Sequence, residues 1–129
     1  MARYVHYNAN PMSNRTGDCV IRAVATVMDK DWYSTAIEIF LQGLIMCDMS
    51  DSDNVWGAYL RANGYKRKAI SDDCPDCYTV REFCDDNPKG RYVLCVPKHV
   101  IAVMHGQYFD TWDSGNETPT YYWYKEDEE

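Results

Sequence analysis

Residues 99–115 read HVIAVMHGQYFDTWDSG and set the organisation of the C-terminal half of the chain. An apolar run over residues 99–104 is followed by His105-Gly106 and then by a second β-rich run over residues 107–112. Two strand-forming runs that are separated by a two-residue, glycine-containing turn are typical of a β-hairpin. The sequence therefore predicts two adjacent antiparallel strands with His105-Gly106 as their turn.

The register of this hairpin brings polar side chains together. With a two-residue turn, His99 lies opposite Trp112 and shares a face with Asp110, its diagonal neighbour. With a three-residue turn, Asp113 would instead lie opposite His99. A histidine beside a carboxylate is the base and orienting partner that an activated nucleophile needs. We therefore expect His99 to pair with Asp110, and Asp113 is the alternate.

A cysteine stands at the predicted start of an early helix. Residues 14–23 read NRTGDCVIRA, and apolar residues recur at helical spacing from there onward. Asp18 is a favourable N-cap residue, which makes Cys19 the first residue of the helix. The N–H groups and dipole at a helix N-terminus favour the thiolate, the reactive form of cysteine. Cys19 is a candidate nucleophile, and a small buried helix residue is the alternative interpretation.

Three more helices are predicted between Cys19 and the hairpin. Asp31 can cap the first, Ser52 or Asp53 the second, and Thr79 the third. The first of them has an apolar stripe, which normally faces the core. This stripe consists of Trp32, Ala36, Ile37, Phe40, Leu41 and Leu44.

The order of elements predicts the fold class. Residues 66–70, 91–97 and 120–124 are the other expected strands, so helices come first and most strands follow. This order predicts an α+β fold with N-terminal helices packed on a small antiparallel sheet. We expect residues 1–16 to be an irregular lead-in and residues 125–129 to be a frayed acidic tail.

The composition limits the partners of the protein. Its 129 residues include 13 Lys and Arg and 20 Asp and Glu, a net charge of −7. An acidic chain is a poor match for nucleic acid, whose binding depends largely on basic residues. No apolar run approaches the roughly 20 residues of a membrane helix, and the N-terminus lacks the apolar segment of a signal peptide. We therefore expect a cytoplasmic protein that binds neither nucleic acid nor membrane.

The cysteines suggest a second kind of site. Six are present, and without a secretory signal they are expected to be free thiols. Cys74 and Cys77 form a CxxC motif, with Cys84 nearby. A structural zinc site needs four ligands, usually as two such pairs, and the chain has one. A turn with two packed thiols is therefore favoured over a metal or redox site, and no cofactor is expected.

Two segments resemble the papain-like superfamily of cysteine peptidases. They are TGDCVIRA (residues 16–23) and HVIAVMHGQYFDTWDSG (residues 99–115), which place a Cys on an early helix before a His and an Asp on adjacent strands. They are most similar to bacterial C39-like peptidases and transglutaminase-like hydrolases. The signatures GDCVxRA and DTWDSG also resemble those of a group of small bacterial and phage proteins. The resemblance implies one papain-like domain over residues 1–129, in a bacterial or host-cell cytosol.

The resemblance also implies roles for individual residues. Cys19, His99 and Asp110 would form a catalytic triad; in transglutaminase-like domains the Asp follows an apolar strand and precedes a Thr-Trp-like element, which favours Asp110 over Asp113. Papain-like peptidases place a Gln before the Cys as an oxyanion donor. This sequence has no Gln there, so Asn14 is the expected donor, with Asn10 as a further possibility.

The expected function is a thiol protease-like hydrolase, either a peptidase or amidase or an acyltransferase, that acts on a peptide or protein substrate. An alternative is a catalytically inactive papain-like fold that binds a protein partner. The order Cys, His, Asp favours the enzyme, and the missing Gln favours the binding module. A small cysteine-cluster metal protein is the third possibility.

Overall fold

The computed structural model describes residues 3–70 and 78–125. Within these ranges the chain forms four helices and six strands, and none of the helices has the length and apolar character to cross a membrane. In chain order the elements are β1 (Arg3–His6), α1 (Cys19–Met28), α2 (Trp32–Met46), α3 (Asp53–Ala62), β2 (Lys66–Ala69), α4 (Val80–Asp86), β3 (Arg91–Val96), β4 (His99–Met104), β5 (Gln107–Asp110) and β6 (Tyr121–Tyr124).

The strands form one sheet in the order β1-β5-β4-β3-β6-β2. The predicted α+β class is confirmed, but the prediction of a small, purely antiparallel sheet is wrong, because β1 pairs in parallel with β5. An irregular lead-in is also wrong for residues 3–6, which form β1. Four residues are too few for a readable alternation of side chains, and this strand is defined by a non-local partner, the free edge of β5.

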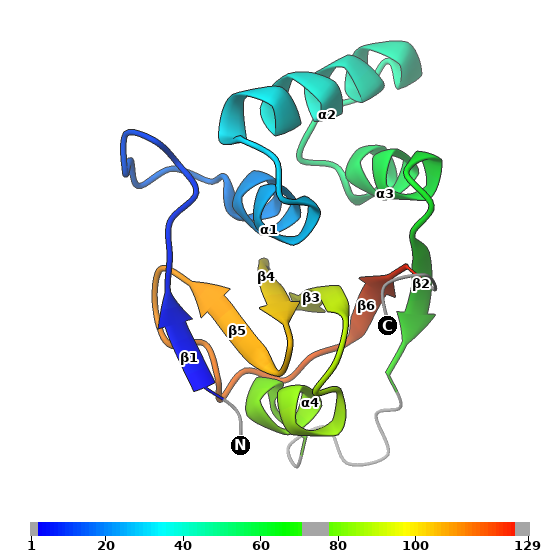
Figure 1. Cartoon of the computed structure of the whole chain (residues 1–129). Coiled ribbons are helices and arrows are strands. Elements are labelled where there is room, and N and C mark those ends of the chain that lie inside the picture. The colour runs from blue at the N-terminus through cyan, green and yellow to red at the C-terminus, as the bar shows by residue number, and fades with distance from the viewer. Residues whose placement is uncertain (1–2, 71–77, 126–129) are drawn as a thin grey trace.

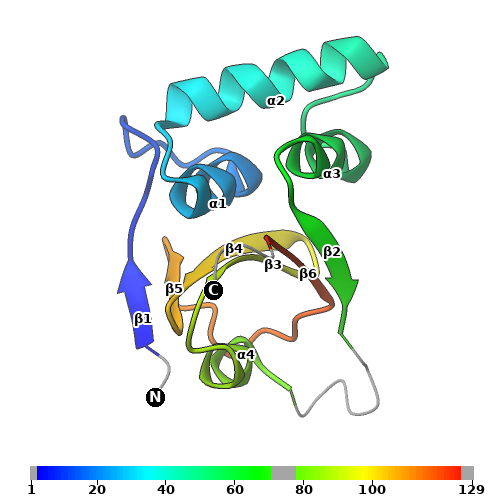
Figure 2. The same cartoon turned by 45° about the vertical axis from the view of Figure 1, so that its right-hand side comes forward.

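Helices cover both faces of the sheet. In Figures 1 and 2, α1, α2 and α3 lie on one side and α4 on the other. The side chains of β4 alternate accordingly: Val100 and Ala102 belong to the core cluster beneath α1 and α3, and Ile101 and Val103 to the cluster beneath α4. Burial on both faces explains why the strand is almost continuously apolar.

The β4–β5 hairpin has the predicted register. Met104 pairs with Gln107, and the two residues between them form the turn. His105 and Gly106 have φ angles of 53° and 76°, the positive values that a type I′ turn requires at both positions. The predicted two-residue turn is therefore confirmed. The antiparallel pairing places the first residue of β4 and the last residue of β5 at the same end of the hairpin.

The helix α2 buries a different face from the one that its sequence predicts. Thr35, Ile39 and Gly43 are buried, whereas most of the larger apolar side chains of the predicted stripe point outward. The small residues allow a close approach to the rest of the protein, since a Cβ atom on Gly43 would lie 2.7 Å from the carbonyl oxygen of Asp48. Both sides of α2 are apolar, so side-chain volume rather than polarity selects the buried side.

The close packing at Gly43 predicts that Gly43→Ala destabilises the protein. The added methyl group must displace backbone, a cost of about 1–3 kcal/mol, of which the higher helix propensity of alanine offsets at most about 1 kcal/mol. Urea unfolding followed by circular dichroism measures the difference. Gly17→Ala is the matched control, because no atom lies within 4 Å of its added Cβ. Equal stability of the two variants would contradict this account of the packing.

Candidate active site

Three elements bring a thiol, an imidazole and a carboxylate together. Cys19 begins α1, His99 begins β4 and Asp110 ends β5. The side chains of Cys19 and His99 hydrogen-bond each other, and His99 Nε2 lies 2.6 Å from Asp110 Oδ2. The structure thus joins residues from the two halves of the chain into one hydrogen-bonded series.

The imidazole of His99 has a defined orientation. An ionised carboxylate only accepts hydrogen bonds, so Nε2 carries a proton that it donates to Asp110, and Nδ1 is the nitrogen that remains for the sulfur of Cys19. The ring of Trp112 lies against that of His99, with centroids 5.1 Å apart and planes inclined by 34°. The hairpin register predicts this proximity. The indole covers one face of the imidazole and restricts its rotation.

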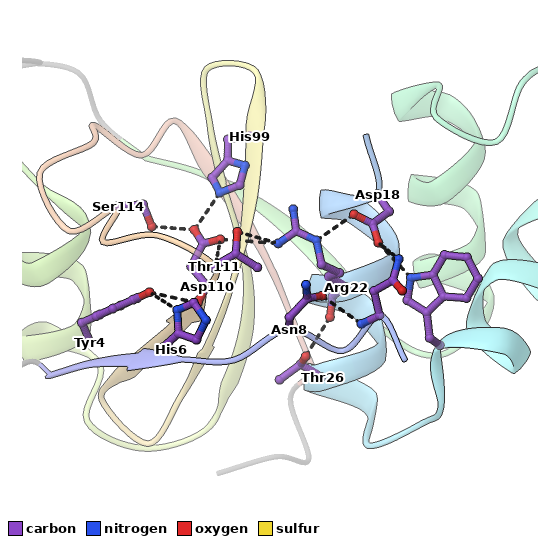
Figure 3. A network of polar contacts seen from close by, with 12 residues as sticks. Tyr4, His6, Asn8, Asp18, Arg22, Thr26, His99, Asp110, Thr111 and Ser114 are labelled. Atoms are coloured by element: carbon purple, nitrogen blue, oxygen red, sulfur yellow. Dashed lines mark hydrogen bonds and ion pairs between the residues drawn. The ribbon is translucent and has the colours of Figure 1, made fainter. Parts of the chain in front are cut away.

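The carboxylate of Asp110 is held on every side (Figure 3). The residue is only 3% exposed. Ser114 Oγ donates to Oδ2 at 2.7 Å and the Thr111 backbone N–H donates to Oδ1 at 2.8 Å. Sequence reasoning missed both donors. The sequence feature that could have indicated them is the run of polar residues directly after β5, which lies close enough to Asp110 to donate hydrogen bonds to its carboxylate.

Arg22 connects the carboxylate to α1. Its guanidinium lies between Asp18 and Asp110 in Figure 3, with Nε 2.8 Å from Asp18 Oδ1 and Nη1 3.7 Å from Asp110 Oδ1. Nη1 also donates to Thr111 Oγ1 at 3.3 Å. One side chain therefore pairs with two buried carboxylates and fixes α1 against the end of β5. The sequence does not indicate this link, because it depends on a contact between distant segments.

Asp18 has a role different from the side-chain cap that its position predicts. It is the N-cap residue of α1, but its carboxylate makes no capping hydrogen bond. That carboxylate instead accepts from Arg22, from Asn10 Nδ2 at 3.1 Å and from Trp32 Nε1 at 3.0 Å. Asp18 therefore leaves uncapped the N–H groups that begin at Cys19, where the helix dipole favours an anion.

The environment favours a thiolate at Cys19. Burial opposes ionisation, but the hydrogen bond and charge of His99, the backbone N–H of Val100 and the charge of Arg22 together place the pKa of the Cys19 thiol below its ordinary value. By contrast, burial raises the pKa of Cys84 and of Cys95 to about 12, so both stay protonated. Cys19 is therefore the reactive thiol of these three.

The environment of His99 completes the pair. Burial disfavours the imidazolium, but the hydrogen bonds and charges of Asp110 and Cys19 favour it and raise the pKa of His99 to about 9. A lowered thiol pKa and a raised imidazole pKa mean that the two groups exchange their proton as a coupled pair. Both shifts favour a thiolate beside an imidazolium.

Cys19 and His99 open into a hollow of about 440 Å³. Val20, Ile21 and Tyr121 contribute apolar walls, and the segment before α3 supplies polar and acidic groups at the edge. A hollow of this size, with apolar walls and several polar groups, can hold a small molecule or a few peptide residues.

Three other expected site residues have different surroundings. Asn14 is exposed and lines a neighbouring hollow rather than the one that contains Cys19, so the structure does not bring it to the thiol. Asp113 accepts from Tyr108 Oη at 2.6 Å and pairs with Arg81 at 3.0 Å, away from His99. Asn10 is buried with its amide committed to Asp18. The backbone N–H of Cys19, at the start of α1, is then the remaining candidate for an oxyanion donor.

The proposed metal site is only partly within the described residues. Cys84 is buried in the core beneath α4, whereas Cys74 and Cys77 lie outside the described residues, so the zinc hypothesis stays a prediction. Within residues 3–70 and 78–125, no cluster of three or more His, Cys, Asp or Glu side chains could hold a metal ion, and the four cysteines there are free thiols.

No similar protein of known function helps to interpret this site, so its geometry is the basis for interpretation. Comparisons of the chain with models of known protein families, with curated proteins and with solved structures gave no match. The resemblance to papain-like peptidases thus stays a prediction from two short segments, and the site's own chemistry carries the functional argument.

The pKa values predict fast and His99-dependent labelling of Cys19. His99→Ala removes the hydrogen bond and the charge that most favour the thiolate and leaves burial, the Val100 N–H and Arg22, so the pKa of Cys19 should rise and iodoacetamide labelling at pH 7 should slow at least tenfold. Peptide mass spectrometry over a pH series measures both quantities. His105→Asn alters the exposed turn histidine with a residue that tolerates positive φ, and should leave the profile unchanged. Identical profiles for His99→Ala and the parent protein would show that the pairing is absent.

The two candidate aspartates predict different effects on His99. Asp110→Asn removes the charge that stabilises the imidazolium and places an amide beside Nε2, so the pKa of His99 should fall from about 9 by at least one unit. Asp113→Asn changes only the contacts with Tyr108 and Arg81 and should leave that pKa in place. NMR titration of the imidazole signals tests both variants. A shift in Asp113→Asn with none in Asp110→Asn would reverse the assignment.

Proposed function

We propose that the protein is a cysteine hydrolase or acyltransferase that acts on a peptide or amide bond. The hydrogen-bonded series Cys19, His99 and Asp110 is the observation that carries the proposal. It supplies a nucleophile whose pKa is lowered below its ordinary value, a proton carrier beside it and a buried group that orients the carrier. Each of these is required to cleave an amide, whose nitrogen leaves only when it is protonated.

The first step forms a thioester. The thiolate of Cys19 attacks the carbonyl carbon, a C–S bond forms and the carbonyl π electrons move to oxygen. The N–H of Cys19, at the start of α1, donates to this oxyanion. As the oxyanion collapses, His99 gives its Nδ1 proton to the departing nitrogen and the C–N bond breaks. The products are an acylated Cys19, a neutral His99 and a free amine.

The second step releases the acyl group. Neutral His99 takes a proton on Nδ1 from a water molecule, or from an acceptor amine or alcohol, while that nucleophile attacks the thioester carbon. The C–S bond breaks and the sulfur leaves as the thiolate, so the thiolate–imidazolium pair is restored. Asp110 accepts from Nε2 throughout, which keeps Nδ1 directed at the reaction. Water gives hydrolysis, and another acceptor gives acyl transfer.

The hollow next to Cys19 supports a substrate with an apolar side chain near the reacting carbonyl. Val20, Ile21 and Tyr121 are partly exposed in its walls. The thiol is also only partly buried, so a carbonyl group can reach it. These features fit catalysis, for which a reactive group has to be both activated and accessible.

The proposal predicts that a simple activated ester acylates Cys19. With 4-nitrophenyl acetate we expect a burst of nitrophenolate, one acetyl group on Cys19 by peptide mass spectrometry, and slow turnover to acetate. Cys19→Ala should abolish the burst, and His99→Ala should reduce acylation about a hundredfold or more. Cys47→Ala removes the exposed thiol at the end of α2 and is the matched control, which should react like the parent protein.

A screen of internally quenched peptides then tests amide cleavage. Turnover that is lost in Cys19→Ala and kept in Cys47→Ala supports the enzyme. Acetylation spread equally over Cys19 and Cys47, with no cleavage of any peptide, would overturn it and favour the alternative of a protein-binding module.

A further inference from the structure

The outward side of α2 is an apolar surface. We define the outer α2 face as Tyr33, Ile37, Phe40, Leu41, Leu44 and Ile45. Each of these residues is between 51% and 78% exposed. In both views α2 is the outermost layer, and none of the drawn elements covers its outward side (Figures 1 and 2).

The six residues form one continuous stripe. Their spacing of three, four, seven and eight positions places them on one side of a helix, opposite the buried Thr35, Ile39 and Gly43. At 1.5 Å per residue the stripe is about 18 Å long. Amphipathic helices pack against one another through apolar stripes of this kind.

The area of this surface matches a protein–protein interface. An aromatic side chain can bury roughly 150–250 Å². With the exposed Met46 and Met49 at its C-terminal end, the outer α2 face offers on the order of 800 Å², as much as each partner contributes to an interface of standard size. The largest apolar patch on a typical monomer covers only about 300–600 Å².

We propose that two copies of the chain associate through their outer α2 faces, with the two α2 helices antiparallel about a two-fold axis near Leu41. An apolar face is complementary to itself, as a two-fold interface requires. Glu38 is the only charged side chain of α2, and Lys30 and Tyr59 bind it at the side of the helix that faces the protein. Association therefore buries no unpaired charge. The antiparallel arrangement also places opposite ends of the helix dipoles together.

The charges around α2 favour a protein partner over a lipid surface. Helices that lie on membranes carry Lys and Arg beside their apolar face. Here Asp29 and Asp31 precede α2, Asp48 follows it, and Lys30 is paired with Glu38. In the antiparallel pair these acidic ends meet across the interface, so their repulsion weakens the dimer at low ionic strength. The dimer is expected to become tighter as salt is added.

Sedimentation-velocity ultracentrifugation of the full chain over a concentration series tests the proposal. The parent protein should sediment as a dimer that tightens between low and high salt. Leu41→Glu and Ile45→Glu should each raise the dissociation constant at least a hundredfold, because each places a charge in the interface. Met12→Glu makes the same kind of change at a methionine that is 71% exposed outside α2, and should leave the dimer intact. Circular dichroism verifies that each variant is folded.

Three results would overturn the proposal: a parent protein that stays monomeric at every concentration and salt, a dimer that survives both α2 substitutions, or equal weakening by Met12→Glu. A monomer that instead co-sediments with phosphatidylcholine vesicles would also overturn it and identify a lipid surface as the partner. The proposal is independent of the catalytic one, so labelling of Cys19 should be unchanged in the monomeric variants.

Discussion

The buried negative charge of Asp110 is the constraint on which the rest of the site depends. An isolated carboxylate in the interior costs several kcal/mol, so a fold that buries one has to surround it with donors and positive charge. Here the donors come from three places: Ser114 and Thr111 in the turn after β5, His99 at the start of β4, and Arg22 on α1. The carboxylate thus fixes how α1 meets the hairpin, and the thiol of Cys19 lies where they meet.

Two positive charges offset the two buried carboxylates of the site. Asp18 and Asp110 supply two buried negative charges, and Arg22 pairs with both. The raised pKa of His99 adds a second positive charge at neutral pH. The thiolate of Cys19 is then the remaining anion, and the start of α1 and the backbone N–H of Val100 stabilise it. Because Asp18 binds Arg22 rather than capping α1, it does not compete with the thiolate for that helix end.

Local sequence signals predict much of this arrangement. The turn at His105-Gly106 determines the register of β4 and β5, and with it the proximity of His99 to Asp110 and Trp112. Cap residues predict where the helices begin, as in the capping box at Thr79. Features that depend on distant segments are not predicted. The parallel pairing of β1 and the bridge made by Arg22 arise from contacts between parts of the chain that no local pattern connects.

The helix α2 shows how packing and the site are coupled. The periodicity of the sequence shows an apolar stripe but does not show which of two apolar sides of α2 is buried. The side with Thr35 and Gly43 is buried because these small side chains let the helix approach the rest of the protein closely. The position that α2 then adopts matters for the site, because Trp32 at its first turn donates to the buried carboxylate of Asp18. Asp18 in turn holds Arg22 against Asp110. The packing of the inward side of α2 therefore supports the same hydrogen-bonded series that orients the imidazole at the thiol.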